Sequence, residues 1–199
     1  MKKALIVVDI QNDFCEGGAL AVPEANNIIP YVNLLMEDTT YDEIILTQDW
    51  HPANHKSFAS NNGRKVGEVI NLNGLPQFMW PDHCVQGTSG AEFHPDLNTK
   101  NVTHIVQKGK NTDSYSGFQD NNHFMKTDLE DYLKFKDIEI VEIVGLALDY
   151  CVKYTCLDAA NAGFITCLHF KGTKAVNAQP GNDKDAIFQL LENNVTILS

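Results

Sequence analysis

The stretch Gly145-Leu146-Ala147-Leu148-Asp149-Tyr150-Cys151-Val152 lies between an apolar run, 138–144, and a helix-like run, 152–162. This order predicts that Cys151 lies where a strand ends and a helix begins. Such a position is open to a ligand and faces the positive end of a helix, which favours a thiolate over a thiol. A single cysteine near a helix start is more often an inert core residue. The interpretation of Cys151 as a nucleophile therefore depends on finding groups that activate it.

Apolar, β-branched runs alternate with helix-like segments along the whole chain. This alternation predicts an α/β fold, with a mostly parallel six-stranded sheet and helices on both faces in a three-layer, Rossmann-like arrangement. Pro30 should lie in the first turns of the first helix, Gly163 should cap the end of the third, and Asn182 should cap the start of the fourth. We expect strands over 4–8, 43–47, 102–107, 139–144, 164–170 and 195–198, and helices over 26–37, 127–135, 152–162 and 182–192.

The length of 199 residues suits a single domain, spanning 1–199, with a sizeable core. One region, at about 50–101, is rich in Pro, Gly, Asn and His and shows no clear periodicity. Loops of that length inside a compact domain are uncommon and usually functional. We therefore expect this region to contribute to a site.

Charge and cysteine content exclude several classes of protein. The formal net charge of -11 argues against a nucleic-acid or anionic-membrane partner, because no stretch concentrates Lys or Arg. No apolar run approaches the length of a membrane span, and the run that ends at Asp9 is too short for a signal peptide. The five cysteines are scattered, without a Cys-x-x-Cys pair. Together these features predict a cytoplasmic protein with reduced thiols.

Four reactive side chains follow strands of the expected sheet. Asp9 ends the first strand, Asp49 follows the second, Lys108 ends the third and Cys151 follows the fourth. Ligands of parallel sheets bind beyond the carboxyl ends of the strands, so these groups could converge there. Asp9 could then accept the thiol proton, and Lys108 could stabilise the thiolate. Each residue alone has an ordinary structural explanation, as a cap, a solvated cation or a core thiol.

The region at 50–101 contains candidate metal ligands. Asp49 and His51 are two residues apart and can point to one side of an extended segment, and His55 and His83 lie nearby in sequence. Carboxylate and imidazole ligands suit zinc, iron or manganese, with positions left for water or substrate. An Asp-x-His pair alone is a weak motif, and an ordinary polar loop would also explain it.

Three aromatic residues, Phe14, Trp80 and Tyr115, occur in the same loops. They could form a flat slot for a planar ring, although packing under a long loop is the more general explanation. No glycine-rich phosphate-binding sequence opens any expected helix, so the sequence gives no support for a nucleotide cofactor.

Taken together, these segments resemble one family over nearly the whole chain. The family is that of the isochorismatase-like hydrolases, in its nicotinamidase (pyrazinamidase) branch. The motifs occur in the family's order, and the set is specific although each motif alone is not. The matching segments are Asp9-Ile10-Gln11-Asn12-Asp13-Phe14, Gly17-Gly18-Ala19-Leu20, Thr47-Gln48-Asp49-Trp50-His51-Pro52, Trp80-Pro81-Asp82-His83-Cys84-Val85, Lys108-Gly109, Tyr115-Ser116-Gly117-Phe118 and Asp149-Tyr150-Cys151-Val152.

The resemblance implies an amidase that converts nicotinamide to nicotinate and ammonia in NAD salvage, with one divalent metal ion, zinc foremost and iron or manganese as alternatives. It also implies an oxyanion hole built from backbone N–H groups. A further implication is a cis peptide bond just after Ala147, where Leu148 replaces the family's usual Thr. The implied catalytic triad is Asp9, Lys108 and Cys151, and Ala147 and Cys151 form the implied oxyanion hole. The implied metal ligands are Asp49, His51 and His83, with His55 as a ligand in some members only. The residues implied around the substrate ring are Phe14, Trp80 and Tyr115.

Two other functions stay open at the level of the sequence. One is an amidase of the same superfamily that acts on another small amide or carbamoyl compound. The other is a non-catalytic redox or metal-binding protein in which Cys151 is a sensor thiol. The sequence also does not choose among the metals or between nicotinamide and pyrazinamide, and it leaves open an assembly of identical copies.

Overall fold

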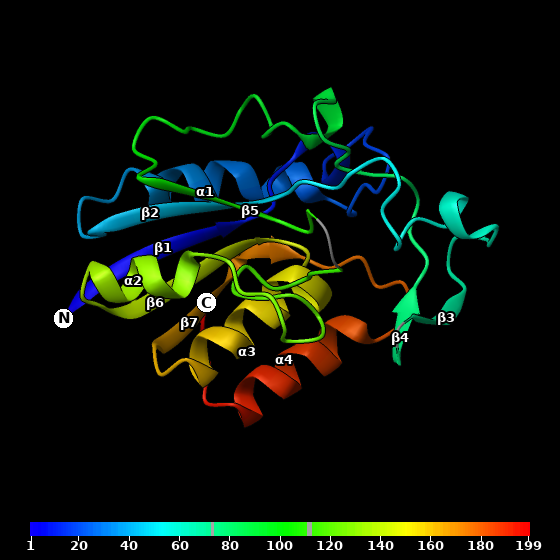
Figure 1. Ribbon diagram of the computed structural model, residues 1–199. Coiled ribbons are helices and arrows are strands. Elements are labelled where there is room, and N and C mark those ends of the chain that lie inside the picture. Colours follow the sequence, from blue (N-terminus) through cyan, green and yellow to red (C-terminus); the bar gives the residue numbers. More distant parts are fainter. Residues whose placement is uncertain (73, 111–112) are drawn as a thin grey trace.

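The main sheet has six strands in the order β5-β2-β1-β6-β7-β8, and every neighbouring pair is parallel (Figure 1). The computed structural model describes residues 1–72, 74–110 and 113–199. The expected α/β fold is confirmed, and its sheet is wholly rather than mostly parallel. The strands are β1 (Lys2–Val8), β2 (Glu43–Asp49), β5 (His104–Lys108), β6 (Ile138–Leu146), β7 (Ile165–Lys174) and β8 (Thr196–Leu198).

Helices cover both faces of this sheet, as expected (Figure 1). Side chains alternate along a strand, so β1 contributes to two separate cores. Leu5 and Val7 pack on the side of α1, whereas Ile6 and Val8 pack on the side of the other three helices. The helices are α1 (Ile29–Met36), α2 (Leu129–Phe135), α3 (Lys153–Asn161) and α4 (Asn182–Glu192).

Some boundaries differ from the expected ones for local reasons. The first helix is divided into a 3-10 turn, Ala25–Ile28, and α1, where Pro30 lies in the first turn and needs no N–H partner. Asn182 is the first residue of α4 rather than its cap, because Gly181 takes the cap position with a left-handed φ of 95°. Gly163 follows the end of α3 with a φ of 94°, as expected for a helix terminus.

The region at 50–101 contains an antiparallel hairpin that the sequence did not predict. Strand β3 (Val69–Leu72) pairs with β4 (Leu75–Phe78), and the hairpin lies apart from the main sheet (Figure 1). Each strand has only four residues and one contains Pro76, so no alternating pattern was visible. Position 73 lies outside the described residues. The hairpin leads directly to Trp80.

All five cysteines carry free thiols, in agreement with the expected lack of a disulfide framework. None of the helices in the described ranges combines the length and the apolar character needed to cross a membrane.

Candidate functional site

The parallel register brings four reactive side chains to one edge of the sheet. Asp9 follows β1, while Asp49 and Lys108 are the last residues of the adjacent strands β2 and β5 and pair with each other in register. Cys151 follows β6, the other neighbour of β1. The convergence expected at the carboxyl ends of the strands is therefore present in the structure.

Lys108 is the centre of this group. Its Nζ lies 2.8 Å from Asp9 Oδ2 and 2.5 Å from Asp49 Oδ1, and it donates to Cys151 Sγ at 3.5 Å. The side chains of Lys108 and Asp9 are fully buried. Thr47, which the sequence analysis did not single out, donates from Oγ1 to Asp9 Oδ1 at 2.7 Å. One buried ammonium is thus shared by two carboxylates and the thiol.

Burial and neighbouring charges shift the ionisation of this group. Burial raises the pKa of the Cys151 thiol well above its ordinary value, and Lys108 only partly opposes this. The expectation that the turn favours a thiolate is therefore wrong, because burial and the nearby carboxylates outweigh the cation. Burial also raises the pKa of Asp9, against the opposing effect of Lys108. Burial lowers the pKa of Lys108, but Asp49 and Asp9 reverse this, so the ammonium stays charged.

Cys151 lies in a single π-helical turn, Leu148–Val152, which continues into α3. The cis peptide bond joins Leu146 to Ala147. The expected position just after Ala147 is wrong by one bond, because Leu146 is the last residue of β6 and the chain leaves the sheet there. Leu148 is buried in the core beside Cys151, which accounts for an apolar residue at this position.

The backbone of Ala147 is oriented so that its two polar groups have different roles. The Ala147 carbonyl accepts from the N–H groups of Tyr150 and Val152, both at 3.1 Å. Within the described part of the chain, the Ala147 N–H has no backbone or side-chain acceptor. An N–H of this kind next to the thiol could donate to an oxyanion.

A possible metal centre adjoins the thiol group. Single ligand atoms of Asp49, His51 and His83 all lie within 4.8 Å of one another, and all three residues are buried. His51 and His83 direct Nδ1 to the carbonyl oxygens of Gly109 and Pro81, at 2.8 and 2.7 Å. Because a carbonyl can only accept, each Nδ1 carries the proton and each Nε2 is left as a ligand.

The ionisation of these side chains fits a divalent cation. Burial lowers the pKa of His83 to about 4, with a further contribution from His51, so its ring is neutral at neutral pH. Burial also lowers the pKa of His51, but Asp49 outweighs it and the net shift is upward. A proton and a metal would therefore compete for His51 Nε2, which lies 3.4 Å from Asp49 Oδ2.

His55 lies beside this group but has other contacts. Its ring stacks on that of His51 with 4.2 Å between centroids. Its Nδ1 shares a hydrogen bond of 2.7 Å with Ser57 Oγ, and its Nε2 lies 3.6 Å from Asp113 Oδ1. Among the described residues, His55 does not belong to a group of side chains whose ligand atoms are close enough together to hold a metal ion.

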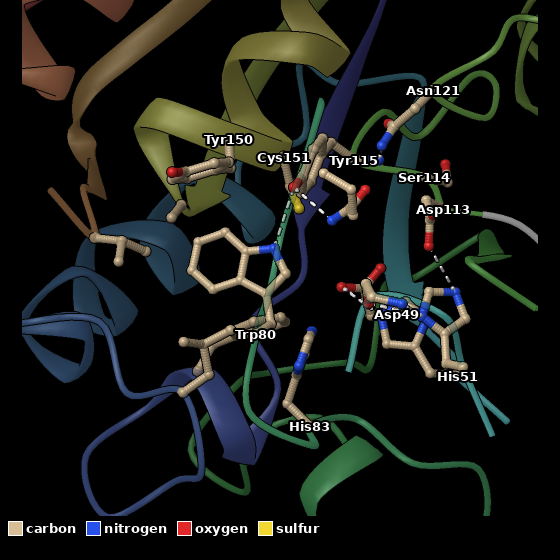
Figure 2. A pocket seen from close by; sticks show the side chains of 17 residues that line it. Asp49, His51, Trp80, His83, Asp113, Ser114, Tyr115, Asn121, Tyr150 and Cys151 are labelled. Carbon is tan, nitrogen blue, oxygen red and sulfur yellow. Dashed lines mark hydrogen bonds and ion pairs between the residues drawn. The ribbon is translucent and has the colours of Figure 1, made fainter. Parts of the chain in front are cut away.

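A cavity joins the thiol to the possible metal centre. Figure 2 shows Cys151, Trp80, His83 and His51 around it. Trp80 donates from Nε1 to Tyr115 Oη at 3.1 Å. All three aromatic residues expected near a substrate ring, Phe14, Trp80 and Tyr115, line this cavity.

Several lining residues were missed from the sequence. Tyr150 packs edge-on against Trp80, with 4.9 Å between ring centroids, and its place beside Cys151 was the available signal. Thr47, which contacts Asp9 but does not line the cavity, could have been noticed as a polar residue inside a buried strand. Gln77 lies in β4, and the other missed lining residues lie in loops; they are Leu20, Ser57, Asp113, Ser114, Asn121 and Val176.

The fold and the cavity define the class of protein. The model of the isochorismatase domain matches residues 3–199, and the chain belongs to the isochorismatase family. Among its relatives, a nicotinamidase of Escherichia coli is 44% identical over 98% of this chain and 93% of its own length. A solved nicotinamidase and pyrazinamidase of Acinetobacter baumanii superposes with a TM-score of 0.95, at 42% identity over 100% of this chain and 96% of that one.

Two further solved relatives contain ligands. The yeast nicotinamidase bound to the inhibitor nicotinaldehyde is 32% identical, with a TM-score of 0.92 over 99% of both chains. The pyrazinamidase of Pyrococcus horikoshii in complex with zinc is 36% identical, with a TM-score of 0.81 over 100% of this chain and 99% of that one.

Proposed function

We propose that this chain is a metal-dependent amidase that hydrolyses nicotinamide to nicotinate and ammonia in NAD salvage. The observation that carries the proposal is one cavity in which the Cys151 thiol, a buried cation and an Asp/His/His group face the same aromatic-walled space. The nicotinamidase activity of the E. coli relative and the nicotinaldehyde bound by the yeast relative support this substrate class.

The first half of the reaction uses the buried triad. Asp9 accepts the proton of the Cys151 thiol, and Lys108 stabilises the resulting negative charge beside it. The sulfur forms a bond to the carboxamide carbon, and the oxyanion accepts from the backbone N–H groups of Ala147 and Cys151. Each such donor contributes about 3 kcal/mol to lowering the barrier. Asp9 then gives its proton to the amide nitrogen, the C–N bond breaks and ammonia leaves.

The second half returns the enzyme to its starting state. Asp9 accepts a proton from a water molecule as the water oxygen attacks the thioester carbon. The C–S bond breaks, Asp9 returns its proton to the Cys151 sulfur, and the product leaves as nicotinic acid, which loses its proton to solvent and becomes nicotinate. Single atoms of the Asp9 carboxylate and the Cys151 thiol lie within 4.8 Å of each other, so one proton can pass between them.

The remaining cavity residues bind and orient the substrate. Phe14, Trp80 and Tyr115 frame the pyridine ring. Asp49, His51 and His83 would hold one divalent ion, and the zinc bound by the P. horikoshii relative supports zinc, with iron and manganese as alternatives. When bound, such an ion supplies a Lewis acid that anchors the ring nitrogen.

We further propose that residues 1–199 act as one domain in the cytoplasm, where the five free thiols stay reduced. Nothing in the chemistry requires a second copy, since every site residue comes from one chain. Pyrazinamide should also be a substrate, because its ring differs little in shape from that of nicotinamide.

The test is ammonia release by the purified protein, with its metal content measured on the same sample. We expect turnover of nicotinamide and pyrazinamide, little turnover of N-carbamoyl compounds, loss of activity on chelation and recovery with zinc. No ammonia from nicotinamide, in folded and metal-loaded protein, would refute the proposal. A preference for N-carbamoyl compounds would instead assign the protein as an amidase of the same family that acts on carbamoyl substrates.

A further inference from the structure

The Lys108 ammonium occupies a position that its neighbours would equally offer to a metal ion. Its Nζ lies 2.8 Å from Asp9 Oδ2, 2.5 Å from Asp49 Oδ1 and 3.5 Å from Cys151 Sγ. Single ligand atoms of Asp9, Asp49 and Cys151 all lie within 4.8 Å of one another, and all three residues are buried. Two carboxylates and a thiolate form a ligand set that suits thiophilic divalent cations such as zinc and cadmium.

Asp49 connects this position to the Asp49/His51/His83 group. Its Oδ1 contacts the Lys108 ammonium, whereas its Oδ2 faces His51 Nε2 at 3.4 Å. One carboxylate therefore presents one oxygen to each of two cation positions. Two-metal centres use the same arrangement, with ions about 3.5–4 Å apart.

Asp9 supplies a fixed and fully buried oxygen to this position. Its Oδ1 accepts the Thr47 hydroxyl, which fixes the carboxylate. Its Oδ2 meets no donor among the described residues in hydrogen-bond geometry, and its close partner is the Lys108 ammonium at 2.8 Å. This oxygen is thus already directed at a cation.

We propose that Asp9, Asp49 and Cys151 form a second cation site, that the Lys108 ammonium fills it, and that Lys108 thereby limits the protein to one metal ion. A metal entering this site would bind Cys151 as a thiolate and release the thiol proton to solvent, with no change of oxidation state. The metal-bound sulfur would share a lone pair with the ion and would be a weaker nucleophile toward a carbonyl carbon. In the native protein this does not occur, because expelling the ammonium would leave a buried charge without its partners.

The experiment titrates metal-free protein with cadmium and follows stoichiometry and thiolate-to-cadmium absorption in the ultraviolet. The native protein should bind one ion per chain without the thiolate band. The variants Lys108→Ala and Lys108→Leu should bind a second ion and show the band, and Cys151→Ser in the same background should remove it. Lys108→Arg, which keeps a cation, should behave as the native protein does. A thiolate band in the native protein, or a folded Ala or Leu variant that binds one ion without the band, would overturn the proposal.

If neither Lys108→Ala nor Lys108→Leu folds, a measurement on the native protein tests whether a metal ion reaches the Cys151 sulfur. Alkylation of the Cys151 peptide, followed by mass spectrometry, should proceed at the same rate with and without saturating cadmium. Slowing by about tenfold would mean that the metal reaches the sulfur past Lys108, and would overturn the proposal. These readouts do not depend on turnover, so they stand apart from the test of the proposed amidase activity.

Discussion

The sheet contains one buried and one half-buried cluster of charged side chains, and the two clusters use their charge differently. The triad cluster, composed of Asp9, Asp49, Lys108 and Cys151, lies at the carboxyl ends of the strands and borders the cavity. The Glu142 cluster lies within β6 on the side of α1. It comprises Glu142, His169, Tyr41, Tyr31 and Lys3.

The two clusters differ in the net effect of burial and partners on the carboxylate. Glu142 Oε2 accepts from Tyr41 at 2.5 Å and from His169 at 2.7 Å, and Lys3 lies 3.4 Å from Oε1. Burial raises the pKa of Glu142, but these partners outweigh it and the net shift is downward. In Asp9, burial outweighs the Lys108 ammonium and the Thr47 hydroxyl, and the net shift is upward. A carboxylate with a lowered pKa stays ionised and stabilises the fold, whereas one with a raised pKa takes up a proton more readily.

The largest expected effect tests the triad cluster. Replacing Cys151 by Ala removes the proposed nucleophile and should lower kcat by roughly 10⁴-fold or more. Cys167→Ala, which changes a half-buried thiol outside both the cavity and the triad, should leave kcat unchanged. Ammonia release measures both. Substantial turnover in a folded Cys151→Ala protein would exclude the nucleophile role.

Asp9→Asn keeps the size of the side chain but removes the base, and should lower kcat/KM by about 10²–10⁴-fold. Only the carboxylate accepts a proton, so native kcat/KM should fall as the pH falls through the pKa of Asp9. Because burial raises that pKa, the fall should occur above the ordinary carboxyl value of about 3.9. A pH–rate profile checks this, and an identical acid limb in Asp9→Asn would assign the limb to another group.

A smaller effect, on zinc affinity, is expected at Gly109, whose backbone packs against the proposed metal ligand His51. Gly109 has a φ of 66°, and a Cβ there would lie 2.3 Å from His51 Cε1. Gly109→Ala should displace the His51 ring and weaken zinc binding by about 10–100-fold, measured by competition with a chelator. Gly63→Ala is the matched control, since Gly63 also has a positive φ, 58°, but its Cβ would meet nothing within 4 Å. Equal zinc affinity in the two variants would contradict this role of Gly109.

The smallest effect on activity is expected in the Glu142 cluster. Glu142→Gln should lower the free energy of unfolding by about 1–3 kcal/mol, because Tyr41 and His169 lose a charged acceptor, while kcat stays unchanged. The pKa of Glu142 is lower in the folded protein than in the unfolded chain. The ionised carboxylate therefore stabilises the fold above the unfolded-state pKa of about 4.3, and this stabilisation is lost as the pH falls through the folded-state pKa. Denaturant unfolding at several pH values measures this. A large loss of kcat would show that the two clusters are coupled.

The sequence predicted what depends on the carboxyl ends of parallel strands. Asp9 follows β1, Asp49 and Lys108 end β2 and β5, and parallel strands present their carboxyl ends at one edge. Their closeness also required that β5, β2 and β1 be neighbours, which the sequence did not show. Placing Cys151 among them required only that β6 be a neighbour of β1.

Other features depend on contacts that no local pattern records. Gln77 reaches the cavity from a four-residue strand, and Asp113 from a loop without periodicity. The direction of the Cys151 pKa shift was mispredicted, because a helix start was visible in the sequence but the burial of the thiol was not. The cis bond was placed one residue too late, since the sequence does not show that β6 extends to Leu146.

The strand order also bears on how the chain is made. Strand β1 occupies residues 2–8, whereas its neighbour β6 occupies residues 138–146 and is synthesised much later. Until then, one edge of an apolar strand has no native partner, which is a condition that favours association with other nascent chains. Non-local pairing of this kind also slows folding. A ribosome-bound fragment that ends before residue 138 should therefore be both inactive and dependent on chaperones.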